Sequence, residues 1–201
     1  VRRAGRKEGA VSGSAAKWGA ILDELERRRA FGRTMGGEER LARQAASGKL
    51  NARQRLEALF DGGAFVEIGG FTGVLSEGGD APAPCDAFVA GFGKSDGRPV
   101  LAGAEDFTVL GGSIGMPAAD KRYRLTEIAA QERLPLVFML EGAGHRPTNS
   151  HDGRTPNDLQ GLAALSGMVP LVSLVMGASA GHGALTAPLC DFVAMTRQAS
   201  I

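Results

Sequence analysis

The stretch "LVSLVMGASAGHGAL", residues 171–185, decides the fold, because it joins an apolar run to a Gly-rich turn and the start of a helix. A short apolar run bounded by turn residues predicts a buried strand. Within the turn, "GASAG" fits the pattern G-x-S-x-G around Ser179. This pattern is compatible with a nucleophilic serine, or with a helix start whose backbone N–H groups hold an oxyanion.

The serine hydrolase interpretation has a good local context but lacks the partners of a catalytic triad. In the fold that uses this motif, an acid and then a histidine follow the serine along the chain. After Ser179 the sequence offers one acid, Asp191, and no later histidine beyond His182, which belongs to the same helix start. The residues therefore favour the backbone interpretation over the hydrolase.

Glycines recur where predicted strands end. Gly177, Gly181 and Gly183 surround the predicted helix start, residues 142–144 follow the apolar run "LPLVFML", and residues 111–115 follow "FTVL". Small residues allow a substrate carbonyl to approach the main chain closely, and free N–H groups at a helix start favour negative charge. Each loop could equally be a structural turn, but together they indicate a site lined by backbone.

Outward from this stretch, strands alternate with Gly-rich loops and helices, which predicts an α/β fold. We expect a disordered tail over residues 1–16, a basic arm of short amphipathic helices over 17–63, and an α/β domain over 64–201. Residues 1–55 hold 14 of the 23 Lys/Arg and 6 of the 22 Asp/Glu. A solvated helical face explains such a bias, and contact with a partner's phosphates or an acidic neighbouring subunit stays open.

Composition excludes several classes of protein. The 201 residues are 43% hydrophobic with a net charge of +1, which predicts a buried core and indicates no nucleic-acid partner. No apolar run is long enough to span a membrane. Cys85 and Cys190 match no zinc or redox spacing, so we expect reduced thiols in a cytoplasmic protein. His145, His151 and His182 lack metal-ligand spacing, so no metal is expected.

Several segments together resemble the carboxyltransferase (beta) subunit of biotin-dependent acyl-CoA carboxylases, such as propionyl-CoA carboxylase. The resemblance runs from about Trp18 to the end of the chain, with its segments in the family's order. These segments are "GKLNARQRLEALFDGGAFVEIGGF", "DGRPVLAGAEDFTVLGGSIG", "EGAGHR" and "SGMVPLVSLVMGASAGHGALTAPLCDFVAM".

The resemblance implies a crotonase-like ββα superhelix that is incomplete at its C-terminal end, within a protein about twice this length. It implies transfer of CO2 from carboxybiotin to the α-carbon of an acyl-CoA, through a thioester enolate held in a backbone oxyanion hole. The implied partners are acyl-CoA, a biotin carboxylase with its biotin carboxyl carrier, and further copies of the subunit. No cofactor bound by this chain is implied. The chain alone is expected to be inactive.

Carried over residue by residue, the family's Gly-Gly donor pair falls on Gly181 and His182, so a histidine replaces the second glycine. The family's Ser-Gly-Gly-Ala falls on Gly142, Ala143, Gly144 and His145, and Arg146 matches the family's arginine.

The resemblance also leads us to expect substrate contacts from the Gly-rich loop and the helix after it. The expected residues are Gly111, Gly112, Ser113 and Lys121. Lys121 and Arg122 are candidates for the CoA phosphates, and a solvated helix face is the alternative. Glu141 and Asp152 are read as loop anchors or acids. Alternative functions are a crotonase-like acyl-CoA decarboxylase or hydrolase, or an inactive chain that retains CoA binding.

Overall fold

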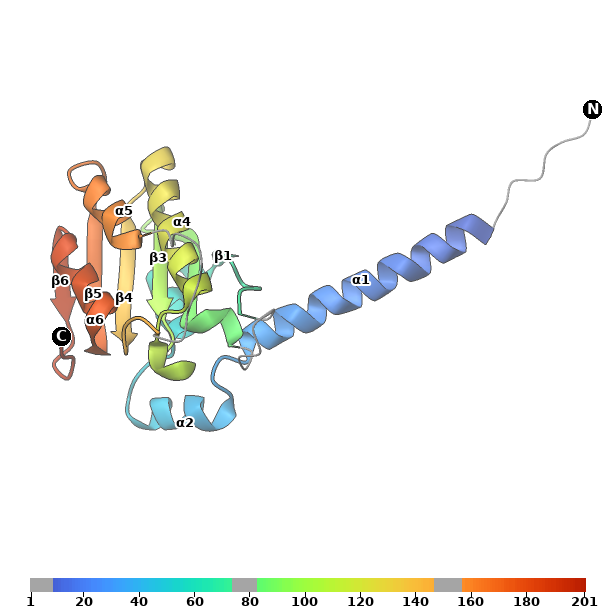
Figure 1. The fold of residues 1–201 in the computed structure, drawn as a ribbon, viewed down its shortest axis with the longest axis horizontal. Coiled ribbons are helices and arrows are strands. Elements are labelled where there is room, and N and C mark those ends of the chain that lie inside the picture. Colours follow the sequence, from blue (N-terminus) through green and yellow to red (C-terminus); the bar gives the residue numbers. More distant parts are fainter. Residues whose placement is uncertain (1–8, 74–82, 147–156) are drawn as a thin grey trace, which may run out of the picture.

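The computed structural model describes residues 9–73, 83–146 and 157–201, with side chains from residue 18 onward. It confirms the α/β architecture, in which helices pack against a mixed sheet (Figure 1). The helices are α1 (Gly9–Arg33), α2 (Glu38–Ala46), α3 (Ala52–Leu59), α4 (Met116–Glu132), α5 (Asp158–Leu165) and α6 (Gly181–Thr186). The strands are β1 (Phe65–Ile68), β2 (Phe88–Ser95), β3 (Arg98–Glu105), β4 (Leu136–Gly142), β5 (Leu171–Ser179) and β6 (Phe192–Met195).

The sheet has six strands in the order β1-β2-β3-β4-β5-β6, so strands that follow one another in sequence lie side by side. β1, β2 and β3 are antiparallel, whereas β3, β4, β5 and β6 run parallel. Parallel neighbours need a crossover, which α4, α5 and α6 supply in turn. The carboxyl ends of β3, β4 and β5 therefore meet at one edge of the sheet, where their Gly-rich loops begin.

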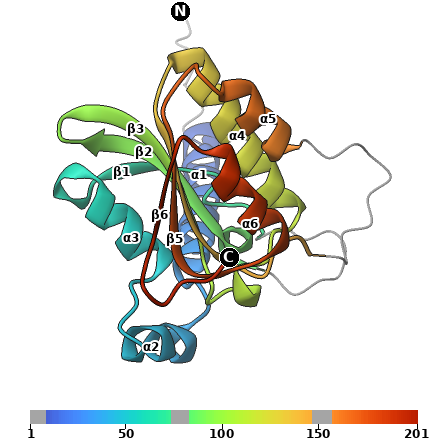
Figure 2. The same ribbon diagram turned by 90° about the vertical axis from the view of Figure 1, so that its left-hand side faces the viewer.

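Alternate side chains of each strand enter two cores, one on each face of the sheet. On β4, Leu136 and Phe138 join the core with α4 and α5, while Val137 and Met139 join the core with α3. This alternation follows from the two-residue period of a strand. Figure 2 shows α4, α5 and α6 along one face of the sheet and α3 against the other. Because both faces of the sheet are covered, the sequences of the parallel strands are continuously apolar.

Local signals in the sequence form the turns and caps that they predict. Asp96 and Gly97 make the two-residue turn between β2 and β3, both with positive φ, as a type I′ hairpin requires. The Asn51 side chain accepts a hydrogen bond from the Gln54 amide and completes a capping box at the start of α3. The Asn157 side chain accepts from the amides of Leu159 and Gln160 at the start of α5.

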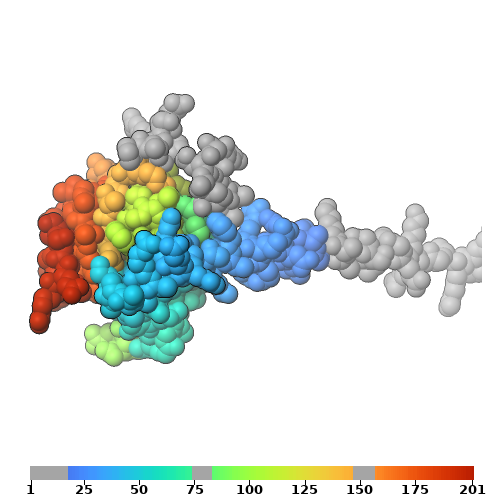
Figure 3. Space-filling view, turned by 90° about the horizontal axis from the view of Figure 1, so that it is seen from below, coloured from blue at the N-terminus to red at the C-terminus, as the bar shows by residue number. Residues whose placement is uncertain are grey.

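The N-terminal arm differs from its prediction in length. α1 begins at Gly9 and spans 25 residues, so residues 9–16 are helical rather than part of a tail. The tail prediction for residues 1–8 lies outside the described residues. α1 projects away from the domain (Figure 1), and Trp18 on it is 62% exposed. α2 folds back over the loop after β3 (Figure 3), where the Gly36 amide donates to Thr108 Oγ1 at 3.0 Å.

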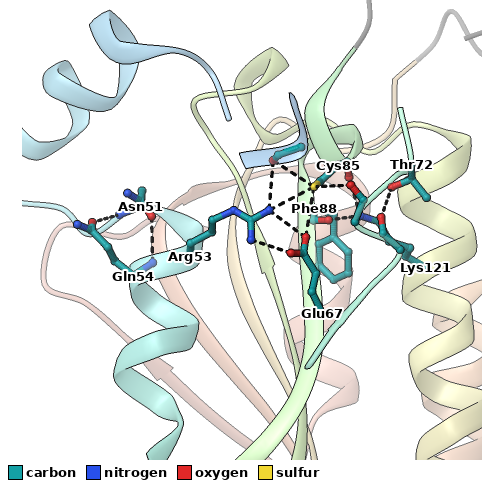
Figure 4. Close-up of polar contacts among 11 residues, drawn as sticks. Asn51, Arg53, Gln54, Glu67, Thr72, Cys85, Phe88 and Lys121 are labelled. Carbon is teal, nitrogen blue, oxygen red and sulfur yellow. Dashed lines mark hydrogen bonds and ion pairs between the residues drawn. The ribbon is translucent and has the colours of Figure 1, made fainter. Parts of the chain in front are cut away.

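A polar junction fastens the arm to the domain (Figure 4). Arg53 of α3 donates to both carboxylate oxygens of Glu67 on β1, at 2.8 and 2.9 Å, and also to the Gly32 carbonyl of α1. The buried Cys85 thiol donates to the same Gly32 carbonyl and forms no disulfide. Part of the arm's positive charge is thus neutralised by the acidic domain, which supports a structural account of the charge bias.

Candidate functional site

The Gly-rich loops meet at the carboxyl edge of the sheet. The Ala143 amide donates to the Gly111 carbonyl at 3.0 Å, which joins the loop after β4 to the loop after β3. The Ala180 amide donates to the Gly142 carbonyl at 3.0 Å, which joins the same loop to the start of α6. The three Gly-rich loops therefore lie together. Gly112 is packed against the Glu141 carbonyl, where a Cβ would approach to 2.4 Å.

Gly144 and Gly181 face each other at the centre of this meeting point. A Cβ on Gly181 would lie 3.7 Å from the Gly144 Cα, and a Cβ on Gly144 would lie 2.8 Å from the Ala180 carbonyl oxygen. Both glycines have positive φ, at 85° for Gly144 and 55° for Gly181. Close approach and backbone conformation therefore both require glycine at position 144.

The amides of Gly144, which is buried, and of Gly181, which is exposed, are candidate donors to a ligand. Neither has a hydrogen-bond acceptor within the described part of the chain. The first amides of α6, from Gly181 and His182, have no intrahelical partner because they begin the helix. Backbone amides that lack an internal acceptor are the kind of donor that can stabilise an oxyanion.

A cavity of about 310 Å³ lies beside these loops. Its lining residues are Phe107, Gly142, Ala143, Ala178, Ser179, Ala180, Ser200 and Ile201. Ser179 is 5% exposed, and its hydroxyl has no hydrogen-bond partner among the described residues. His182 does not activate this hydroxyl, because its ring contacts Asp158 instead. Among the described residues, none is hydrogen-bonded to the Ser179 hydroxyl as the base that a serine nucleophile needs.

Beneath the start of α6 lies a buried charged network. His182 Nε2 is 2.5 Å from Asp158 Oδ1, and Arg122 Nε donates to Asp158 Oδ2 at 2.6 Å. Arg122, fully buried, also donates to Glu105 at 3.3 Å and to the Thr186 hydroxyl at 2.5 Å. The network links α4, α5, α6 and β3, and so fixes the position of the His182 backbone.

The charge of each acid in this network follows from its neighbours. Burial works to raise the pKa of Asp158, but the His182 hydrogen bond and the Arg122 guanidinium outweigh it and lower the pKa to about 2. Burial raises the pKa of Glu105 above its ordinary value, although Arg122 opposes this effect. Asp158 is therefore the permanent anion that holds His182.

The stability of the chain should depend on Asp158 in acid. A carboxylate whose pKa is depressed in the folded state contributes stability above its unfolded pKa and loses it as the pH falls through the folded value. A shift of one pKa unit corresponds to about 1.4 kcal/mol, so Asp158 contributes roughly 2 kcal/mol to the free energy of unfolding at neutral pH. This contribution is lost as the pH falls from about 4 to about 2. Urea unfolding over this range should show a smaller acid loss for Asp158→Asn than for the wild type. Equal losses would contradict the assignment, and Asp96→Asn in the exposed hairpin turn is the control.

Glu141 anchors the arm next to the site. Its carboxylate accepts from Lys49 at 2.6 Å and from the buried Arg55. Its own amide donates to Glu105 Oε2 at 2.8 Å. The loop-anchor interpretation of Glu141 is confirmed, whereas Asp152 lies outside the described residues.

Two expected substrate residues have structural partners. Lys121 is 5% exposed and its Nζ donates to the carbonyls of Cys85 and Phe88, as Figure 4 shows. Burial lowers the pKa of Lys121 to about 8. The expectation that Lys121 neutralises CoA phosphates is therefore wrong, because its ammonium group points into the protein.

Arg146 donates to Asp86 at 2.9 Å and to the Ser113 carbonyl at 3.0 Å, so it holds two of the Gly-rich loops together.

A second cavity, of about 450 Å³, opens beside the first and shares Phe107 with it. Its lining residues are Arg40, Arg43, Gln44, Ser47, Lys49, Phe107, Thr108, Leu110, Gly111 and Glu141. The cations come from α2 and the segment after it, which lie over the domain (Figure 3). Sequence reasoning missed this basic cavity, although the clustering of Arg and Lys in the arm was its signal.

The described residues contain no group of three or more acidic, histidine or cysteine side chains that could hold a metal ion. None of the described helices combines the length and apolar character needed to cross a bilayer.

The class of the protein is an α/β chain in which Gly-rich loops meet at the carboxyl edge of parallel strands, with a basic cavity beside them. The particular family follows from comparison with known proteins. Residues 43–201 match the carboxyl transferase domain, and the chain belongs to this family. Its fold is the crotonase-like α/β superhelix of these carboxyltransferases.

The relatives agree in sequence and in structure. The propionyl-CoA carboxylase beta chain of Cereibacter sphaeroides is 35% identical over 190 residues, covering 90% of this chain and 36% of the relative. The methylmalonyl-CoA decarboxylase alpha subunit of Veillonella parvula is 35% identical over 175 residues, covering 82% of this chain and 33% of the relative. The chain thus spans about a third of the length of these relatives.

Among solved structures, the transcarboxylase 12S hexamer with bound hydrolysed methylmalonyl-coenzyme A superposes with a TM-score of 0.77 at 34% identity, covering 89% of this chain and 36% of that one. A single-chain, multi-domain long-chain acyl-CoA carboxylase gives a TM-score of 0.80 at 31% identity, covering 90% of this chain and 20% of that one.

Proposed function

We propose that this chain forms the N-terminal part of the carboxyltransferase subunit of a biotin-dependent acyl-CoA carboxylase. The observation that carries the proposal is the pair of facing glycines, Gly144 and Gly181, with available amides in a chain of the carboxyl transferase family. The reaction transfers CO2 from carboxybiotin to the α-carbon of an acyl-CoA. The enzyme class of the relatives supports the reaction type, and the identity of the acyl group is left open.

In this mechanism the backbone stabilises the charge that develops on the substrate. The amides of Gly144, Gly181 and His182 donate hydrogen bonds to the thioester oxygen as an acyl-CoA becomes an enolate. One such donor is worth about 3–4 kcal/mol of barrier. Carboxybiotin, delivered by a carrier protein, would supply the CO2, and the biotin ureido group that remains would take the α-proton. We assign no residue of this chain to the biotin group.

We assign the CoA nucleotide to the basic cavity. Arg40, Arg43 and Lys49 line it, and CoA phosphates need such cations. Phe107, shared by both cavities and 46% exposed, would lie along the pantetheine between them. Of the loop residues expected to contact substrate, Gly111 lines the basic cavity, and we propose that Gly112 and Ser113 support it from the same loop.

The partners follow from the same proposal. They are a biotin carboxylase with its biotin carboxyl carrier, and further copies of the subunit, for which the apolar exposed face of α1 is a candidate contact. We place the protein in the cytoplasm. Because the chain spans about 36% of its propionyl-CoA carboxylase relative, we expect carboxylation only when it is combined with the rest of such a subunit and a biotin carrier.

A crotonase-like decarboxylase or hydrolase acting on acyl-CoA is the second candidate, and the Veillonella parvula relative named as a decarboxylase subunit favours it. An inactive, CoA-binding chain is the third. Carboxybiotin-dependent formation of a carboxylated acyl-CoA by the assembled subunit would support the first. Loss of CO2 from a carboxylated acyl-CoA without a biotin carrier would support the second, and binding without turnover the third.

Replacing Ser179 with alanine should leave carboxyl transfer within about twofold of the wild type, because the proposal gives its hydroxyl no chemical role. Removing a nucleophile would instead cost several powers of ten in kcat. Measurement of kcat for acyl-CoA carboxylation checks this directly. A Ser179→Ala variant that binds acyl-CoA but does not turn over would favour the G-x-S-x-G hydrolase interpretation.

A further inference from the structure

The turn before β2 holds three consecutive residues in the left-handed region. Cys85, Asp86 and Ala87 have φ of 53°, 47° and 59°. Each of them is strained, because in this conformation the Cβ lies too close to the following carbonyl oxygen. Such strain persists only where the surroundings fix it, and it gathers at functional sites. Lys121 Nζ, which donates to the Cys85 carbonyl at 2.6 Å, fixes this turn from α4.

The strained turn directs the Asp86 carboxylate inward, where it joins two elements that are distant in the sequence. The side chain is 3% exposed. Oδ2 accepts from the Ala118 amide in the first turn of α4 at 2.9 Å, and Oδ1 accepts from Arg146 Nη1 at 2.9 Å. A Cβ on Gly115 would lie 2.4 Å from Asp86 Oδ2 and 2.5 Å from Arg146 Nη1, so the backbone packs directly on this ion pair. The pair therefore has a fixed geometry.

Arg146 extends this restraint to Gly144. Its Nη2 donates to the Ser113 carbonyl at 3.0 Å and its Nε to the Ser113 hydroxyl at 3.2 Å, so Asp86 holds one side of the guanidinium and Ser113 the other. The Arg146 amide donates to the Ile114 carbonyl at 2.8 Å, and the Ile114 amide donates to the Gly144 carbonyl at 2.8 Å. Residues 144–146 are thus bonded at both ends to one loop, and Asp86 anchors that assembly.

We propose that Asp86 is a positioning residue, which acts through Arg146 to hold the Gly144 amide in place for the thioester oxygen. The inference rests on the proposed function, in which this amide is a donor to the enolate. Asp86 lines neither cavity assigned to substrate, so its effect on the reaction is indirect. A misplacement of about 1 Å in a reacting group can cost about 10²-fold in rate, so loss of the restraint should appear in kcat.

The first test is carboxyl transfer by the assembled subunit carrying Asp86→Asn. Asparagine keeps the size of the side chain and tolerates a positive φ, but it removes the charge that holds Arg146. We expect kcat at saturating propionyl-CoA to fall about 10–100-fold. The Kd and stoichiometry of propionyl-CoA binding, measured by calorimetry, should stay within about twofold of the wild type, since the donor acts most strongly on the enolate. A merely structural role would lower the stoichiometry together with the rate.

The matched control for this variant is Asp61→Asn. The Asp61 carboxylate also accepts from two backbone amides, those of Asp96 and Gly97, but it does so at the β2–β3 hairpin turn. This variant should have the wild-type kcat. A loss in Asp61→Asn equal to that in Asp86→Asn would overturn the inference, because any buried or bonded carboxylate would then have the same effect.

A double-mutant cycle tests whether Asp86 acts through Arg146. Arg146→Lys keeps the charge but loses the planar fork that spans Asp86 and Ser113, so it should lower kcat by a similar factor. In that background, Asp86→Asn should cost less than about threefold more, because the residues belong to one chain of contacts. Losses that multiply would overturn the inference, and so would the wild-type kcat in either single variant.

Hydrogen–deuterium exchange on the chain itself separates this inference from the function on which it depends. The segment 142–146 should exchange about fivefold faster or more in Asp86→Asn, because the bond from the Arg146 amide to Ile114 would open more often, and at the wild-type rate in Asp61→Asn. Unchanged exchange in Asp86→Asn would overturn the positioning role even if kcat falls. Faster exchange, with a wild-type subunit that performs no carboxyl transfer, would overturn the proposed function and the catalytic role of this restraint with it.

Discussion

Carboxyl transfer by the assembled subunit is expected to fall by about 10²–10³-fold when Gly181 is replaced with proline. Proline has no N–H, so the first donor of α6 disappears. Its ring also fixes φ near −65°, whereas Gly181 has a φ of 55°. The loss should appear in kcat more than in KM, because the amide interacts most strongly with the charged enolate oxygen. Steady-state carboxylation rates at saturating acyl-CoA measure this effect.

Two alanine variants separate the lost donor from backbone strain. Gly181→Ala keeps the amide and places its Cβ 3.7 Å from the Gly144 Cα, an ordinary contact. Gly167→Ala imposes the same left-handed strain in a turn where a Cβ meets nothing within 4 Å. Both should retain kcat within about tenfold, since the strain costs about 1 kcal/mol. A Gly181→Pro variant that is folded and has the wild-type kcat would show that this amide is not a donor.

The largest effect on stability is expected from Arg122→Met, at about 3–5 kcal/mol in the free energy of unfolding. Arg122 is fully buried and bonds Asp158, Glu105 and Thr186. Its guanidinium also lies 4.7 Å from the centroid of the Phe138 ring. Methionine would fill much of the volume of the arginine side chain. It would leave the carboxyl groups of Asp158 and Glu105 buried without their cationic partner. Urea unfolding followed by circular dichroism measures the difference.

The matched control is Arg124→Met on the same helix. Arg124 is exposed, pairs with Glu127 three residues along, and should change stability by less than about 1 kcal/mol. Arg122→Met with an equally small effect would mean that the network does not hold the start of α6.

Local and periodic features of the fold could be predicted from sequence. The Asp96–Gly97 turn and the Asn51 cap depend on neighbouring residues, and the apolar runs that became β4 and β5 depend on burial at both sheet faces. The glycine loops could be expected to meet because the carboxyl ends of parallel strands share one edge. The facing of Gly144 and Gly181 follows from that topology.

The charged network could not be predicted, because its members come from separate elements. Arg122 and Asp158 lie 36 positions apart and meet only after α4 and α5 pack on the sheet. Lys121 shows the same difficulty. A lysine near the start of a predicted helix is expected to be solvated or to bind a phosphate. In the structure, α4 directs the Lys121 ammonium group toward the carbonyls of Cys85 and Phe88. Helix orientation, which no local pattern of charges specifies, decides these roles.

The most direct test of the central claim is a crystal structure of the chain with bound propionyl-CoA. The account predicts the thioester oxygen about 2.7–3.1 Å from the amide nitrogens of Gly144, Gly181 and His182. It also predicts the CoA phosphates beside Arg40, Arg43 and Lys49, with the Ser179 hydroxyl making no bond to the acyl group. A thioester carbonyl turned away from these amides, or an acyl group attached to Ser179, would contradict it.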